Sequence, residues 1–186
     1  MAAARTLFAE RGFFATTVED LAAAAEVSPA TVYSSTGGKQ GLLDLLLEAW
    51  GSDPTIQNTL DRVESAANGR EVIDVLARAA CEMREEWDDV VGIFLTTAPH
   101  DAAIAAQYAP FDAFYRECVT TIAARLSDLK ALRRGADAQY AAEILWLYFG
   151  YGSISTLHHD SGWTYDRIGP WLADQASREL LRQERS

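Results

Sequence analysis

Apolar residues recur at intervals of three and four along most of this chain, the spacing that places them on one face of an α-helix. The clearest run consists of Ile104, Tyr108, Phe111, Tyr115, Cys118, Ile122, Leu126 and Leu129. No stretch alternates convincingly between apolar and polar residues, as a half-buried strand would. The sequence therefore predicts an all-α fold of nine to ten helices.

Breaking residues divide the first 51 positions into four short helices. Gly12 ends a helix that begins near Met1, because glycine accepts the left-handed conformation at a helix C-terminus. A second helix is expected to begin at Thr16 or Thr17, where Glu19 completes a Ser/Thr-x-x-Glu capping pattern. The first two helices are therefore separated by only a few residues.

The third and fourth helices follow equally short breaks. Ser28 is a good N-cap and Pro29 suits the first helical position, so a helix is predicted from Pro29 to about Ser34. Two glycines then make a turn, and Lys39 opens a leucine-rich helix that ends at Gly51.

Longer helices are predicted in the remainder of the chain, near residues 54–67, 70–86, 87–97, 104–130, 137–158 and 166–183. Pro110 should kink or restart the helix that contains it. The segment from Tyr140 to about Leu157 is apolar nearly all round, so it must be covered on more than one side. A second subunit is the expected cover, and Gly150 and Gly152 would permit close approach.

The charge balance excludes indiscriminate binding to nucleic acid, which depends on neutralising phosphates with Lys and Arg. The net charge is -11, and the first 50 residues hold Arg5, Arg11 and Lys39 against six carboxylates. No apolar run approaches the roughly 18 residues of a membrane span, and the N-terminus lacks a secretory pattern. A cytoplasmic protein without a membrane partner is expected.

Residues that could carry catalysis or bind a metal are better explained structurally. Cys81 and Cys118 are isolated and are expected to be buried. His100 and the pair His158 and His159 fall at predicted helix ends, where such residues often cap or face solvent, and adjacent histidines on a regular helix point in different directions. We expect no catalytic residues, no metal and no cofactor.

The lysine that follows two glycines, Lys39, could also suggest a phosphate-binding loop of an ATPase. Such a loop needs Ser or Thr after the lysine and a strand before it, whereas Gln40 follows and no strand is predicted. Nucleotide hydrolysis is therefore not expected.

The second and third helices carry the spacing of a helix-turn-helix. Two helices that cross steeply need a small residue at the crossing, apolar residues on each helix and a turn of about 3 to 4 residues. Leu21, Ala22, Val27 and Val32 fit these roles. Glu26 stands where many such turns place glycine to relieve a positive φ. From this pattern alone, two short core helices with no DNA role remain an alternative.

The stretch L-F-A-E-R-G-F-F-A-T-T-V-E-D-L-A-A-A-A-E-V-S-P-A-T-V-Y, from Leu7 to Tyr33, closely resembles the DNA-binding region of the TetR family of transcriptional regulators. The G-G-K that precedes the leucine-rich helix continues the resemblance. The body is similar more loosely to part of the family, through L-R-R-G near 132, A-A-E-I-L-W near 141 and G-W-T-Y-D-R near 162.

The resemblance implies a helix-turn-helix DNA-binding domain over residues 1–51 and a ligand-binding and dimerisation domain over residues 52–186. It places the helix from Pro29 to Ser34 in the major groove of double-stranded DNA, with Ala30, Thr31 and Ser34 near base edges. It also implies phosphate contacts from Thr17, Ser28, Tyr33 and Lys39. Hydroxyls and helix N-terminal amides are suitable phosphate donors.

The sequence departs from the family pattern after Tyr33. Ser34, Ser35 and Thr36 stand where the family usually has a basic or aromatic pair followed by phenylalanine, so modest affinity for each half-site is expected. The basic arm that usually precedes the first helix is not in the sequence as given, which leaves open where the natural chain begins.

The resemblance also implies a pocket for a small-molecule effector in the body, although most aromatic residues there are expected to be core. Candidate lining residues are Trp87, Phe94, Thr97, Tyr108, Phe111, Tyr115, Trp146 and Phe149.

The sequence thus predicts a ligand-responsive regulator, a repressor that binds a near-palindromic operator as a homodimer through the helices near 104–130 and 137–158. One alternative is a TetR-like dimer that has lost strong DNA binding and acts as a ligand- or protein-binding module. An enzyme that uses His158 or His100 is the other.

Overall fold

The computed structural model describes residues 1–182, which form two compact units. Unit 1 consists of residues 1–53 and 87–112, and unit 2 consists of residues 54–86 and the described residues from 113 onward. The predicted division into residues 1–51 and 52–186 is one of function and stays a prediction.

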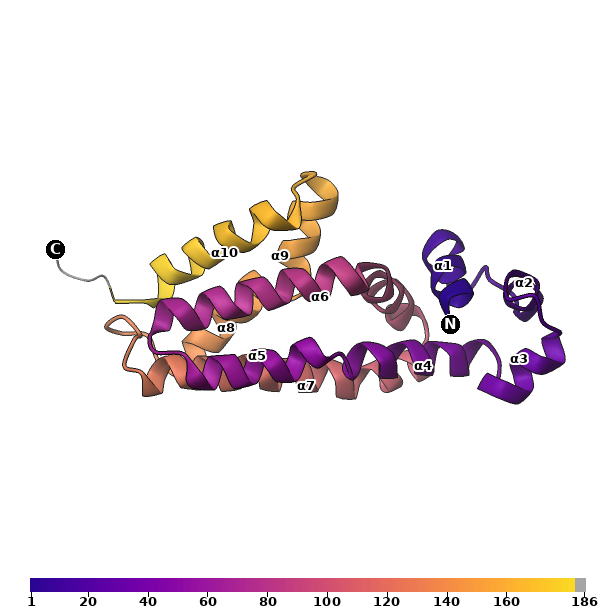
Figure 1. Ribbon diagram of the computed structural model, residues 1–186, viewed down its shortest axis with the longest axis horizontal. Coiled ribbons are helices and arrows are strands. Elements are labelled where there is room, and N and C mark those ends of the chain that lie inside the picture. Colours follow the sequence, from indigo (N-terminus) through magenta and orange to yellow (C-terminus); the bar gives the residue numbers. More distant parts are fainter. Residues whose placement is uncertain (183–186) are drawn as a thin grey trace. The chain divides into compact units, whose positions relative to one another are not determined.

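Unit 1 begins with the four predicted short helices, α1 (Ala2–Arg11), α2 (Val18–Ala24), α3 (Pro29–Thr36) and α4 (Lys39–Gly51) (Figure 1). Helix α2 packs against α1 and α3, and α3 packs against α4. The unit is completed by the C-terminal part of α6 (Gly69–Thr97), the 3-10 turn η1 (Ala98–His100) and the first part of α7 (Ala102–Asp128). Its buried side chains include Phe8, Leu21, Leu43, Leu46 and Phe94.

Unit 2 contains α5 (Pro54–Ser65), the remaining parts of α6 and α7, α8 (Ala138–Phe149), α9 (Tyr151–Ser155), the π-helical turn η2 (Thr156–Asp160) and α10 (Tyr165–Leu180). A single apolar core joins these helices, with fully buried members such as Ile73, Leu126, Leu145, Ile168 and Leu180. Helix α8 packs against α9 and α10.

The all-α prediction is confirmed over residues 1–182, where the only extended pairing is an isolated bridge between Leu132 and Leu181. The backbone of Arg133 donates to Leu180 and that of Arg182 donates to Ala131, so this bridge ties the loop after α7 to the end of α10. Over the same residues, no helix has both the length and the apolar character needed to cross a bilayer.

Two predicted helix boundaries were wrong. The helices expected at 70–86 and 87–97 are one, because neither Glu86 nor Trp87 interrupts the hydrogen-bonded ladder of α6. Helix α7 continues through Pro110 without restarting, so of the two expected effects of this proline only a kink stays a prediction. The segment expected near 137–158 instead breaks at Gly150, whose backbone is extended between α8 and α9. The predicted end of the last helix, Gln183, lies outside the described residues.

Gly41 allows α3 and α4 to approach closely. A Cβ added at this position would lie 1.5 Å from the carbonyl oxygen of Thr36, the last residue of α3. Backbone atoms cannot yield as a flexible side chain can, so only glycine fits here. Gly92, in α6 of the same unit, has no atom within 4 Å of an added Cβ.

We therefore expect opposite effects from the same substitution at the two glycines. Gly41→Ala should lower the free energy of unfolding by about 2 kcal/mol or more, because α3 must be displaced. Gly92→Ala should raise it by about 0.5–1 kcal/mol, because alanine costs less conformational entropy in a helix. Urea denaturation of both variants measures the difference. Equal stability of the two variants would contradict the close approach.

Candidate DNA interface

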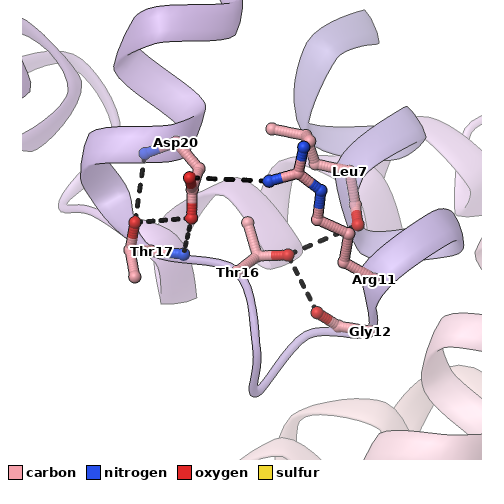
Figure 2. Close-up of polar contacts among 6 residues, drawn as sticks. All are labelled: Leu7, Arg11, Gly12, Thr16, Thr17 and Asp20. Atoms are coloured by element: carbon pink, nitrogen blue, oxygen red, sulfur yellow. Dashed lines mark hydrogen bonds and ion pairs between the residues drawn. The ribbon is translucent and has the colours of Figure 1, made fainter.

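The start of α2 is fixed by a reciprocal cap between Thr17 and Asp20 (Figure 2). The Thr17 hydroxyl accepts a 3.1 Å hydrogen bond from the Asp20 amide, and the Asp20 carboxylate accepts from the Thr17 amide at 2.9 Å. The predicted cap at Thr16 or Thr17 is confirmed at Thr17. The expected partner Glu19 was wrong, because the third helical position after Thr17 is Asp20.

The carboxylate of Asp20 is also electrostatically stabilised. The hydrogen bond from the Thr17 side chain lowers the pKa of Asp20 below its ordinary value, and the Thr17 amide and the nearby Arg11 lower it further. The guanidinium Nη1 of Arg11 lies 3.5 Å from Asp20 Oδ1 (Figure 2). One of the cations of α1 is therefore paired with the first turn of α2.

Thr16 fixes the turn that precedes α2 from the inside. Its buried hydroxyl contacts the carbonyl oxygens of Gly12 at 2.8 Å and Leu7 at 3.3 Å (Figure 2). Leu7 lies within α1, and Gly12 is the residue that caps the C-terminus of that helix. This contact ties α2 to α1.

The turn between α2 and α3 holds Glu26 in the left-handed region, with φ 56°. This is the conformation for which glycine is common at this position, and it costs a residue with a Cβ roughly 1–2 kcal/mol. The amide of Val27 bonds the Ala22 carbonyl at 2.9 Å and closes the turn. The Val27 side chain, however, is 43% exposed, so the prediction that it holds the two helices together was wrong. Leu21, Ala22 and Val32 are buried as predicted.

Helix α3 is the most exposed helix of the module. The Ser28 hydroxyl caps it by accepting from the Thr31 amide at 3.1 Å, and the helix runs two residues beyond the predicted end, to Thr36. Val32 is the one residue of this helix that is buried. The other predicted contact residues of α3 are all exposed, namely Ala30, Thr31, Tyr33 and Ser34.

The hydroxyls of α3 are engaged locally. Thr31 Oγ1 lies 2.8 Å from Ser28 Oγ, and both Ser34 and Ser35 donate to the Thr31 carbonyl. The Thr36 hydroxyl donates to the carbonyl of Val32 at 2.8 Å, and Thr36 is only partly exposed. The exposed face of α3 is therefore built from methyl groups, hydroxyls and one tyrosine ring.

Tyr33, the fifth of the eight residues of α3, is 58% exposed. Its ring rests on Gly38, since a Cβ on that glycine would lie 2.9 Å from the ring. Gly37 and Gly38 both have positive φ, and Gly37 has the left-handed conformation that ends α3. The ring edge and hydroxyl thus stay at the surface while one face is supported.

Lys39 occupies a different environment from the one that the family resemblance implies. Its ammonium donates to the carbonyl oxygens of Phe13 at 2.8 Å and Thr16 at 3.0 Å, and it lies 4.4 Å from the Phe13 ring centroid. Two of its three N–H groups are therefore directed to the α1–α2 turn. This arrangement gives Lys39 a clear structural role, whereas its predicted phosphate contact stays a prediction.

Every cation of unit 1 has an acidic or carbonyl partner. The unit has three Lys and Arg residues against eleven carboxylates. Besides Arg11 and Lys39, the third is Arg5, whose Nε donates to Asp89 at 2.6 Å and whose guanidinium lies 4.9 Å from the Trp87 ring centroid. The pairing of Arg5 with Asp89 was not predicted from the sequence, because the two residues are 84 positions apart.

The predicted ligand-lining residues are divided between the two units. Phe94, Tyr108 and Phe111 form an aromatic cluster in unit 1 with Trp50, which had not been predicted, and the centroids of Trp50 and Phe111 are 4.0 Å apart. Thr97 is buried, and Trp87 Nε1 donates to Asp53 at 2.8 Å.

In unit 2, the hydroxyl of Tyr115 donates to the carbonyl of the buried Phe149 at 2.7 Å, and its ring meets Trp146 edge-on at 5.3 Å. These contacts are typical of core aromatic residues. The assignment of the predicted set to an effector site stays a prediction.

A mostly apolar groove of about 590 Å³ lies on unit 2. It is formed by α8, α9, η2 and α10 and is lined by Trp146, Leu147, Tyr148, Tyr151, Gly152, Ser153, Thr156, Leu157, Trp171 and Leu172. Leu147 is 59% exposed and Trp171 is 41% exposed, so both add apolar surface to this groove.

The paired histidines lie on η2, a π-helical turn rather than the regular α-turn assumed from the sequence. His158 Nδ1 lies 2.9 Å from the Trp163 carbonyl, and its ring stacks on Tyr165 at 4.4 Å. These contacts give His158 a structural role in unit 2.

The sequence profile of bacterial regulatory proteins of the tetR family matches residues 1–46. No curated protein matches the sequence. Among solved structures, the TetR-family regulator PfmR of Thermus thermophilus is similar with a TM-score of 0.76 and 19% identity, covering 97% of this chain and 95% of that one.

Two repressors of efflux pumps are equally similar in fold. NalD of Pseudomonas aeruginosa, the secondary repressor of MexAB-OprM, has a TM-score of 0.78 and 21% identity over 98% of this chain and 94% of its own. SmeT of Stenotrophomonas maltophilia, solved as a complex with triclosan, has a TM-score of 0.76 and 21% identity over 97% of this chain and 89% of its own.

The class that these findings define is an all-α protein with an N-terminal helix-turn-helix and the fold of known regulators. The predicted resemblance to the TetR family is confirmed over residues 1–46, which match the sequence profile of that family.

The contacts of Lys39 predict the outcome of Lys39→Met, which keeps the aliphatic stem and removes the charge. The free energy of unfolding should fall by about 1–3 kcal/mol, because two carbonyls lose a charged donor. The chain's other lysine, the exposed Lys130, supplies the control, and Lys130→Met should change stability by less than about 0.5 kcal/mol.

A phosphate contact at Lys39 would give a different result. Lys39→Met would then leave stability unchanged and would reduce by about 1 the slope of log affinity for DNA against log salt concentration. Denaturation and salt titration of the same variant separate the two roles.

Proposed function

We propose that this chain is a ligand-responsive transcriptional repressor that binds double-stranded DNA as a homodimer. The observation that carries the proposal is the exposure of α3, whose side chains other than Val32 reach solvent, whereas α2 buries Val18, Leu21 and Ala22 and packs against α1 and α3. A helix-turn-helix needs this combination of an anchored first helix and an accessible second helix that can enter the major groove.

The candidate contact residues fall into two groups. Ala30, Thr31 and Ser34 lie on α3 and would face base edges. Ser28, Tyr33 and Thr17 carry hydroxyls at the start of α3, in its C-terminal half and at the start of α2, where phosphates would lie. To donate to a phosphate, the Thr17 hydroxyl would have to leave its 2.6 Å hydrogen bond to the Asp20 carboxylate. The N-terminal amides of α2 and α3 would add neutral donors to the same phosphates.

The apolar groove of unit 2 supports a dimer through α8 and α10. The sequence favoured the helices near 104–130 and 137–158, and α8 belongs to the second of these. Exposed Leu147 on α8 and Trp171 on α10 make a larger apolar surface than Phe114, the large exposed apolar residue of α7. A symmetric pair of subunits would cover this surface twice and would present two copies of α3.

The response to a small molecule is supported by the fold. SmeT is similar to this chain over nearly its whole length and was solved with triclosan. We propose that an effector binds among the aromatic residues of the helical body and favours a shape with lower DNA affinity, with a coupling of about 1–3 kcal/mol.

A second candidate is a TetR-like dimer without strong DNA affinity. The observation in its favour is that Arg5, Arg11 and Lys39 are all engaged within unit 1, which has a large excess of carboxylates. Direct measurement of DNA binding decides between the two.

DNA binding can be tested by footprinting and fluorescence anisotropy on the duplex upstream of the chain's own gene. Thr31→Asp should weaken binding at least about tenfold, because a carboxylate on α3 would repel the phosphates. Thr121→Asp places the same charge on an exposed helical position of α7 and should leave affinity within about twofold. Absence of protection by the unmodified protein at low salt would contradict the proposal.

The dimer surface can be tested by introducing a charge at Leu147. Leu147→Glu should convert the dimer to monomer at micromolar concentration, because an uncompensated carboxylate would be buried at the subunit contact. Leu95→Glu is the matched control, since Leu95 is also exposed but belongs to α6 of unit 1. Sedimentation velocity measures both. A dimeric Leu147→Glu protein would exclude this surface as the interface.

A further inference from the structure

We infer that α3 reads its half-site through the methyl groups of thymine and not through guanine. This inference rests on the proposed DNA-binding function and specifies the bases that the same helix selects. It follows from three observations: α3 exposes methyl groups, it contains no Arg or Lys, and the nearby cations Lys39 and Arg11 are engaged in other contacts.

The commonest specific contact to guanine is a bidentate hydrogen bond from Arg or Lys to O6 and N7 in the major groove. Helix α3 has the sequence Pro-Ala-Thr-Val-Tyr-Ser-Ser-Thr and contains neither residue. Guanine therefore has no charged partner on the helix that would enter the groove.

The flanking cations are held elsewhere. Lys39, three residues after α3 ends, directs its ammonium to the carbonyls of Phe13 and Thr16. Arg11 faces Asp20 at the start of α2. Reaching a base would require either side chain to give up these contacts, and the loss of Lys39 would leave two carbonyl groups of the α1–α2 turn without their donor.

The N-terminal half of α3 presents methyl groups instead. The N-terminal residues of a recognition helix are those that contact base edges, and Ala30 and Thr31 occupy the second and third positions of α3. Both are exposed. Alanine and the methyl group of threonine are suitable apolar partners for the C5-methyl group of thymine.

The side chain of Thr31 is fixed in a way that favours this role. Its Oγ1 lies 2.8 Å from Ser28 Oγ, within the cap of the helix. The hydroxyl is thereby engaged, and the methyl group is the apolar surface that this side chain offers. Ser34 and Ser35, one turn later, donate to the Thr31 carbonyl and leave their oxygen lone pairs as acceptors, which suits the amino group of an adenine paired with thymine.

The test begins with binding of the full chain to a pool of random-sequence duplexes and isolation of the enriched sites. The best duplex is then prepared in three forms, with thymine, with uracil in its place, and with 7-deazaguanine in place of guanine. Uracil lacks the C5-methyl group and 7-deazaguanine lacks the N7 acceptor, while base pairing is kept in both.

We expect the uracil duplex to bind more weakly by about fourfold for each contacted methyl group, which corresponds to about 0.8 kcal/mol for burial of one such group. The 7-deazaguanine duplex should bind within about twofold of the original. Weaker binding of the 7-deazaguanine duplex together with undiminished binding of the uracil duplex would overturn the inference and leave DNA binding intact. Failure to enrich any duplex would instead overturn the proposed function, and this inference with it.

A double-mutant cycle identifies the protein partner of the methyl group. Thr31→Ser removes the methyl group and keeps the hydroxyl that joins the helix cap, so the fold should be preserved. The variant should lose about fourfold on the thymine duplex and should lose less when the contacted thymine is already uracil. Thr121→Ser is the control and should leave both affinities unchanged. Full additivity of the Thr31→Ser and uracil effects would show that this methyl group does not contact thymine.

Discussion

The ammonium group of Lys39 is the contact on which the geometry of the N-terminal module depends. Lys39 is the first residue of α4, and its ammonium donates to the carbonyls of Phe13 and Thr16 in the turn between α1 and α2. One charge thus joins the first, second and fourth helices across 26 positions of sequence. Gly41 adds the second constraint, because it lets the end of α3 approach α4 backbone to backbone. These two constraints, at Lys39 and Gly41, fix the position of α3 even though Val32 is its one buried residue.

This arrangement changes the expected chemistry of DNA recognition. Most nucleic-acid interfaces obtain much of their affinity from cations that neutralise phosphates. Here the three cations of unit 1 are used to hold helices and turns, and the exposed surface of α3 is neutral. Affinity would then come from hydroxyls, helix amides and apolar contacts with bases, which are shorter in range and depend more on a close fit.

Local sequence rules predicted the helices well and their contacts less well. The breaks at Gly12, Ser28 and Gly51 followed from capping and helix-stop residues, because these act within one or two turns. The continuity of α6 was missed because periodicity alone cannot separate one long helix from two with the same phase. The exposure of Val27 and the pairing of Arg5 with Asp89 were missed. Both are decided by how segments distant in the sequence pack, and a pattern of neighbouring residues does not contain that information.

The left-handed residue between α2 and α3, Glu26, affects the stability of the module without belonging to the residues that are proposed to contact DNA. Glu26 contributes its backbone to the turn, and its side chain is exposed. The backbone strain at Glu26 lowers the stability of unit 1. The α3 groups that would contact DNA begin only at Ser28. Glycine at this one position would therefore relieve the strain and raise the stability of the module, while the side chains of α3 that are proposed to contact DNA stay unchanged.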